Sequence, residues 1–224
     1  MICELNCEHQ NGIYTVNAAS RLRGTGSITG NGGVTLAAAN SKLCGALTVN
    51  NLTAASGGTY GDQWNAVSAK VATSYFAAGT QTIENGSFTI GAGCAVTNAA
   101  GTANTTDATF SIAANANLVL GKSVTVGALT VADGGSITLA GARNSAAQLT
   151  VAGTLTQSGK INIVLDFGDR NPPPSAKFPL LAAAGVNLAN VTLRDKGNVS
   201  KWRITYENGV VYGSTDSGFA IRLR

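Results

Sequence analysis

The sequence predicts an all-β fold: a right-handed parallel β-solenoid (β-helix) with a C-terminal antiparallel β cap. Short segments alternate apolar and polar residues, and similar segments recur about twenty residues apart. Charged residues make up only 12% of the chain, whereas about 25% is usual. Glycine supplies 28 of the 224 residues, and most of the rest are Ala, Thr, Ser, Asn and Val. Such residues suit strands and tight turns, so we expect little helix.

The alternating segments predict short strands in which apolar residues face one way and Thr or Ser the other. Gly, Asn, Asp or Ser bounds most of them, as is typical of turns. The expected strand cores are residues 27–29, 34–36, 47–49, 87–90, 109–112, 118–120, 124–126, 129–131, 137–139, 149–151 and 160–165.

Internal similarity indicates how these strands stack. Leu118–Leu120 resembles Ile137–Leu139, 19 residues later, and Leu129–Val131 matches Leu149–Val151, 20 residues later. A spacing near twenty residues is typical of one turn of a parallel β-helix, in which each turn stacks on the last. A β-sandwich is the competing fold. It usually has longer strands and more buried aromatic residues than a chain with 6% aromatics provides.

Changes in composition and in the apolar–polar pattern divide the chain into three parts. Residues 1–22 are expected to form an N-terminal extension or cap, residues 23–167 the solenoid turns, and residues 168–224 the C-terminal β cap. Within the cap, Pro172–Pro174 should stop any strand, and Asn208-Gly209 should form a hairpin turn. Strands are expected at 202–206, 210–212 and 219–224. A cap is needed because a solenoid end exposes unpaired backbone and open core.

Residues 57–84 interrupt the rhythm with a group of aromatic residues. Asp62 to Ala78 could form a short helix or a side excursion from one turn. The aromatic residues could cover an open core edge or contact a ligand, since insertions in solenoids often map to a functional face. The candidate ligand contacts are Tyr60, Trp64, Tyr75 and Phe76.

The four cysteines leave several states open. Cys3, Cys7, Cys44 and Cys94 could form two disulfides in an oxidising compartment, and Cys3 and Cys7 are close enough to pair locally. Free or intermolecular thiols are the alternative. Zinc bound by Cys3, Cys7 and His9 is disfavoured, because their spacing is unlike that of structural zinc sites and no second ligand pair follows.

No catalytic residue, metal site or cofactor is predicted. His9 is the only histidine, and no Gly-x-Ser-x-Gly nucleophile elbow is present. The glycines of 24–26 and 30–33 suggest turns, because no helix or Gly-Lys-Ser/Thr follows to form a phosphate loop. Asp166, Asp169 and Arg170 form one tight charged group, for which a capping salt bridge is the simpler explanation and a glycan-active site the alternative.

Charge and hydropathy exclude two classes of partner. The net charge is +4, and the basic residues that gather after Lys160 are mixed with acidic ones, so no nucleic-acid partner is expected. No apolar run approaches the ~20 residues of a membrane span. The first ten residues carry acids where a signal peptide has a basic and then an apolar region, so no export signal is visible.

One stretch resembles a known family. Residues 22–36 contain Gly24-x-Gly26-x-Ile28 and then Gly32-Gly-Val-Thr-Leu36, and residues 39–49 contain Asn40-Ser41 and Gly45-x-Leu47-Thr48-Val49. This pattern resembles the autotransporter-associated β-strand repeat, with about thirty residues matched well and weaker echoes as far as Leu165. The resemblance implies a right-handed β-helical passenger on a bacterial surface that acts in adhesion, in aggregation or as a stalk.

Together these observations lead us to expect a non-enzymatic structural or adhesive protein, extracellular or on the bacterial cell surface. Its expected partners are copies of itself, stacked end to end into a fibre, and surface glycans. The alternative is a β-helix that binds glycans or degrades polysaccharides, because such folds also carry carboxylate clusters for that chemistry.

Overall fold

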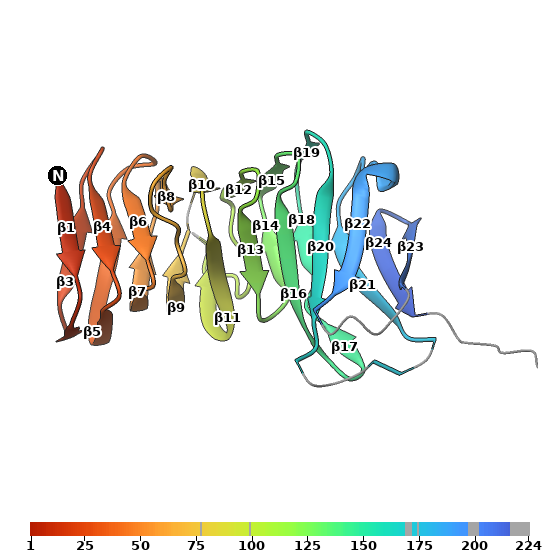
Figure 1. The fold of residues 1–224 in the computed structure, drawn as a ribbon, viewed down its shortest axis with the longest axis horizontal. Helices are drawn as coiled ribbons and strands as arrows, with labels where there is room; N and C mark the ends of the chain where they lie inside the picture. Colours follow the sequence, from red (N-terminus) through yellow and green to blue (C-terminus); the bar gives the residue numbers. More distant parts are fainter. Residues whose placement is uncertain (77, 99, 169–171, 174, 197–201, 216–224) are drawn as a thin grey trace, which may run out of the picture.

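The computed structural model of the chain is a β-solenoid of about seven turns, and its turns follow one another along the long axis of the molecule (Figure 1). The structure describes residues 1–76, 78–98, 100–168, 172–173, 175–196 and 202–215, without the side chains of residues 92 and 94. The predicted fold class is confirmed: parallel coils make up most of the chain, and antiparallel strands follow at the C-terminal end.

Two long sheets form most of the wall of the solenoid. Sheet A has eight strands, all paired in parallel: β1 (Ile2–Leu5), β4 (Arg21–Gly24), β6 (Lys42–Gly45), β8 (Gly57–Tyr60), β10 (Thr80–Ile83), β12 (Thr109–Ile112), β15 (Ala128–Val131) and β19 (Leu155–Gln157). The central path of sheet B is also parallel: β2 (Glu8–Gln10), β5 (Ser27–Leu36), β7 (Thr48–Thr53), β9 (Lys70–Tyr75), β11 (Ser87–Thr97), β13 (Asn117–Leu120), β16 (Ser136–Ala142), β20 (Ile161–Asp166) and β22 (Val191–Asp195).

Shorter elements complete the wall. Strand β3 (Ile13–Val16) pairs with β5 in parallel, and β17 (Ser145–Ala146) pairs with β16 in antiparallel. Sheet C follows the order β14 (Val124–Val126), β18 (Leu149–Val151), β21 (Lys177–Ala182), β24 (Val210–Thr215) and β23 (Trp202–Glu207). Its last three strands are antiparallel. One 3₁₀ turn, η1 (Leu188–Asn190), precedes β22, and no helix in the described part of the chain is long and apolar enough to cross a membrane.

Alternation along each strand builds the core in columns. Registered partners in sheet B place one apolar residue per turn in a single buried column: Ile28, Val49, Val71, Ile90, Leu120, Leu139 and Leu165. On the outer side of sheet A, a column of hydroxyl side chains runs through Thr82, Ser111, Thr130 and Thr156. The period-two pattern therefore separates core from surface, and each buried aliphatic side chain adds about 1.5–3 kcal/mol of burial free energy.

One of the two predicted matches between coils differs in the structure. The match between Leu118–Leu120 and Ile137–Leu139 is the true register, but Leu129 pairs with Leu155, and Leu149 pairs with Val124 in sheet C. Identical letters twenty residues apart therefore lie on different sheets. The reason is that β16 extends into a hairpin with β17, which delays the next strand.

The solenoid also extends beyond the expected domain boundaries. Strands β1, β2 and β3 already pair in parallel with β4 and β5, so residues 1–22 form a coil with the same pairing as the next. At the other end, β21 and β22 continue the parallel pairing past residue 168, and only β23 and β24 join in antiparallel. The predicted Asn208-Gly209 turn is present, with both residues at positive φ. The strand expected at 219–224 lies outside the described residues.

Candidate functional site

A loop at one corner of the solenoid is the main departure from the regular coils. Two positions separate Leu43 from Gly45 and three separate Ile83 from Gly86, but seven separate their counterparts Tyr60 and Val67. The extra residues form a loop at 61–66, between β8 in sheet A and β9 in sheet B. The excursion expected over 57–84 is therefore confined to this corner. The helix considered for Asp62 to Ala78 is wrong, because β9 occupies that stretch.

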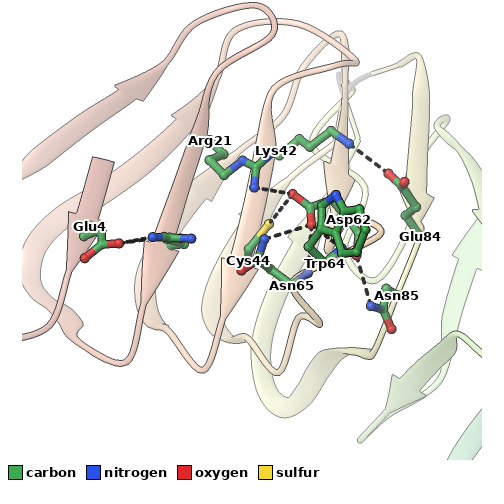
Figure 2. A network of polar contacts seen from close by, with 10 residues as sticks. Glu4, Arg21, Lys42, Cys44, Asp62, Trp64, Asn65, Glu84 and Asn85 are labelled. Atoms are coloured by element: carbon green, nitrogen blue, oxygen red, sulfur yellow. Dashed lines mark hydrogen bonds and ion pairs between the residues drawn. The ribbon is translucent and has the colours of Figure 1, made fainter. Parts of the chain in front are cut away.

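Asp62 anchors this loop and is buried, with only 2% of its surface exposed. Its Oδ1 accepts hydrogen bonds from the backbone N–H groups of Trp64 (2.9 Å) and Asn65 (2.8 Å), and from the Asn65 side chain (2.9 Å). Its Oδ2 lies 2.8 Å from Nη1 of Arg21, two coils away (Figure 2). Asn85 in the next coil donates a hydrogen bond of 3.0 Å to the Asp62 carbonyl. The loop is thus tied to coils on both sides.

The electrostatics of the loop follow from this geometry. Burial is the largest single influence on Asp62 and opposes its ionisation, but the hydrogen bonds from Asn65 and Trp64 and the charge of Arg21 together lower the pKa of the carboxyl group. Cys44, in the neighbouring strand β6, has its Sγ 3.9 Å from Oδ2 of Asp62. Burial, and then the Asp62 charge, raise the pKa of this thiol to about 11. The site therefore contains an ionised carboxylate and a protonated, buried thiol.

Trp64 projects from the loop into solvent, with 79% of its surface exposed. Its backbone is fixed through Asp62, while its indole has no hydrogen bond or ring contact among the described residues. The other described tryptophan, Trp202, stacks on Phe167 with ring centroids 6.0 Å apart and donates a hydrogen bond of 2.9 Å to Asp195. Trp64 therefore differs from Trp202, whose ring stacks on Phe167 and is hydrogen-bonded to Asp195.

A shallow groove of about 360 Å³ reaches the loop at Asn65 and Ala66 and follows the corner across the first coils. Its polar wall is formed by Glu4, Asn6, Arg23, Thr25 and Asn65, together with Gly24, Gly45 and Ala66. Arg23 donates hydrogen bonds to Glu4 on the neighbouring strand, and Lys42 forms a similar cross-coil ion pair of 3.1 Å with Glu84 (Figure 2). The groove thus offers amide and hydroxyl groups with nearly balanced charge.

The four predicted aromatic contacts do not form one surface. Tyr60 and Phe76 are fully buried and belong to an aromatic core cluster, in which Tyr60 lies 4.1 Å from Phe88 and Phe76 lies 5.6 Å from Phe110, between ring centroids. Tyr75 is partly exposed on sheet B. Only Trp64 lies at the corner loop. Sequence reasoning missed Asn6, Thr25 and Asn65, which carry no local signal and meet only because the coils stack.

The described cysteines are free thiols. Cys3 and Cys7 are exposed and Cys44 is buried, so no disulfide joins these three, while the Cys94 side chain lies outside the described part. Cys3 belongs to β1 in sheet A and Cys7 lies just before β2 in sheet B, which separates a pair that looked close in sequence. Cys7 Sγ lies 3.1 Å from Nε2 of His9, but the described residues include no group of three metal-ligating side chains.

The charged group expected at the end of the solenoid is only partly described. Asp166 accepts a hydrogen bond of 2.6 Å from Lys196, and mainly this contact lowers the pKa of the Asp166 carboxyl group. Asp169 and Arg170 lie outside the described residues. A second groove of about 520 Å³ lies nearby on sheet B, lined by Asn117, Ser136, Thr138, Val164, Arg194, Asp195 and Lys196.

Comparisons with known proteins identify no relative: no family model, curated protein or solved structure matches this chain. The resemblance of residues 22–49 to the autotransporter-associated repeat therefore stays a prediction from the residues.

Proposed function

We propose that this chain is a non-catalytic structural and adhesive β-solenoid, displayed on a bacterial surface or secreted. The observation that carries the proposal is the continuous apolar core, which links every described coil from Leu5 to Val211 in one cluster. Such a core makes a stiff rod, because each coil completes the hydrogen bonds of its neighbours.

The use of charged residues supports a mechanical role. Glu4 pairs with Arg23, Asp62 with Arg21, and Glu84 with Lys42, so each ion pair joins one coil to another. The Glu4–Arg23 and Lys42–Glu84 pairs are partly exposed and contribute little stability singly, but all three pairs fix the register between coils. We infer that these carboxylates join neighbouring coils. In a hydrolase or lyase the catalytic carboxylates would instead have to be free to contact a substrate.

Solution scattering and negative-stain images of the purified chain test the rod. We expect an elongated particle at all concentrations, and end-to-end filaments at high concentration if the chain self-associates. Bacteria that display the chain should also clump or adhere more than bacteria that display Val49→Asp, because this change places an unpaired charge in the core column of sheet B. A compact particle, or adhesion equal to that of the Val49→Asp control, would exclude the proposed function.

A further inference from the structure

Trp64 is the one large aromatic side chain in the described part of the chain that is almost wholly exposed. Burial of a large aromatic side chain normally stabilises a fold, and Trp64 does not contribute in this way. A single exposed apolar residue is common on protein surfaces and means little alone. What distinguishes Trp64 is that Asp62 fixes its backbone and that Asn65, the next residue, lines a groove.

The support is a buried charge. Taking a carboxylate out of water is costly unless it is paired and hydrogen-bonded. Asp62 meets this requirement, because its Oδ1 accepts three hydrogen bonds and its Oδ2 forms an ion pair with Arg21. The three hydrogen bonds to Oδ1 are donated by the backbone N–H groups of Trp64 and Asn65 and by the Asn65 side chain. The loop is therefore held in one conformation before any ligand arrives, and such preorganisation lowers the entropic cost of binding.

The groove supplies the polar half of a binding site. Asn65 belongs both to the loop that Asp62 anchors and to the groove wall, and it directly follows Trp64 in the chain (Figure 2). Asn6 and Thr25 add an amide and a hydroxyl group from the first two coils. Glu4 and Arg23 neutralise each other but keep unused acceptor and donor positions, since their side chains are 51% and 37% exposed.

From this combination we infer that the 61–66 loop and the corner groove bind a neutral oligosaccharide chain, with Trp64 as the stacking platform. A pyranose ring has an apolar C–H face that packs on an indole, and a rim of hydroxyl groups that pair with amides, hydroxyls and charged side chains. The volume of the groove, about 360 Å³, lies within the range usual for small-ligand sites. This inference rests on the proposed adhesive function and names the ligand class of one of its sites.

The charge balance favours a neutral chain over an anionic one. Arg23, the cation in the groove wall, is paired with Glu4, and Arg21 beneath the loop is paired with Asp62. A uronate or sulfated polymer would need a cation that is not matched by a carboxylate. A protein partner is the other possible occupant of an exposed tryptophan, because tryptophan is frequent at interface hot spots.

An array of neutral chito-, malto- and manno-oligosaccharides tests the inference, with heparin and polygalacturonate as anionic probes. The chain should bind at least one neutral series, and titration with that oligosaccharide should change the fluorescence of Trp64. Binding should persist in about 0.5 M NaCl, where the Debye length is only a few ångströms.

Three variants locate the site. Trp64→Ala should weaken binding about tenfold or more, because a lost aromatic stacking contact is worth about 1.4 kcal/mol, and Trp64→Phe should recover part of this loss. Tyr75→Ala removes another exposed aromatic residue, away from the loop, and should bind normally. Asp62 is a positioning residue, so Asp62→Asn should weaken binding mainly by slowing association while Trp64 remains present. Circular dichroism checks that each variant is folded.

Each other outcome overturns the inference. These outcomes are failure of every neutral oligosaccharide to bind, binding of anionic polymers only with loss in salt, and equal binding by Trp64→Ala. A Trp64→Ala variant that loses self-association instead of glycan binding would assign the loop to a protein interface. If the array is blank while the particle is elongated and cells still adhere, the saccharide site is excluded and the proposed adhesive function stands.

Discussion

Tyr60 donates a hydrogen bond of 2.7 Å to Oε1 of Gln81 in the interior of the solenoid, where both side chains are fully buried. The Gln81 amide in turn donates a hydrogen bond of 2.9 Å to the carbonyl of Ala54. This short polar chain therefore links sheet A to the end of β7 in sheet B. Burial raises the pKa of Tyr60, which keeps its hydroxyl group protonated as a donor.

We expect this buried pair to be coupled energetically. Gln81→Leu should lower the free energy of unfolding by about 1–3 kcal/mol, because it leaves the Tyr60 hydroxyl group without a partner. Tyr60→Phe should cost a similar amount. The double variant should cost less than the sum, since it removes both partners, and urea unfolding of all four proteins measures the coupling. Strict additivity would show that the two side chains act independently.

The corner glycines are expected to be essential to the stacking of the coils. Gly45 has φ +83°, and a Cβ there would lie 2.3 Å from the carbonyl oxygen of Gly24. Gly45→Ala should therefore destabilise the fold by at least the ~1–3 kcal/mol of a strained backbone position. Gly91→Ala is the matched control, because a Cβ at Gly91 meets nothing within 4 Å. Thermal unfolding compares the two, and equal melting temperatures would contradict this account of the corner.

Acid should loosen the fold partly through Asp62. Because its pKa is lowered in the folded state, Asp62 contributes stability that is present above its ordinary value of 3.8 and is lost as the pH falls through the folded value. Asp62→Asn should be less stable at neutral pH, since Arg21 loses its partner, and should lose less stability on acidification. Asp166 also has a lowered pKa, so part of the acid response should remain. Urea midpoints at about pH 7 and pH 3 test this, and parallel losses in both proteins would exclude Asp62 as a contributor.

Thiol labelling should distinguish the cysteines. Cys44 is fully buried and its pKa is raised to about 11, so little thiolate exists near neutral pH and reagent cannot reach it. Iodoacetamide applied to the native chain should label Cys3 and Cys7, which are exposed, and should label Cys44 only after unfolding in urea. Peptide mass spectrometry identifies the labelled sites. Labelling of Cys44 in the native chain at the rate of Cys7 would show that the loop opens readily.

Much of the wall could be predicted because its signal is local. Ser87–Ile90, Thr109–Ile112 and Leu149–Val151 alternate apolar and polar residues, and each lies in a strand. Strands with weaker alternation were missed, among them Arg21–Gly24 and Gly57–Tyr60. Glycines and charged residues interrupt the apolar–polar alternation in these segments. They form strands because they pair with the neighbouring coils.

The corner site could be predicted only in part. The aromatic content of residues 57–84 drew attention to Trp64, but nothing in the sequence separates its exposed indole from the buried ring of Tyr60. Arg21 and Asp62 are 41 positions apart and meet because two turns of the solenoid bring them together. Contacts between coils depend on the number of residues in every intervening turn, which short motifs do not encode.

Composition and period-two alternation by themselves determined that this chain would form short strands and tight turns, because those patterns act within a few residues of one another. The recurrence of similar segments about twenty residues apart then indicated a parallel β-solenoid. The tertiary structure alone decided the register of the coils, the length of the corner loop and the meeting of Glu4, Arg23 and Asn65 at one groove. These depend on how each coil sits on the next and on the number of residues in each connecting turn, which differs from coil to coil.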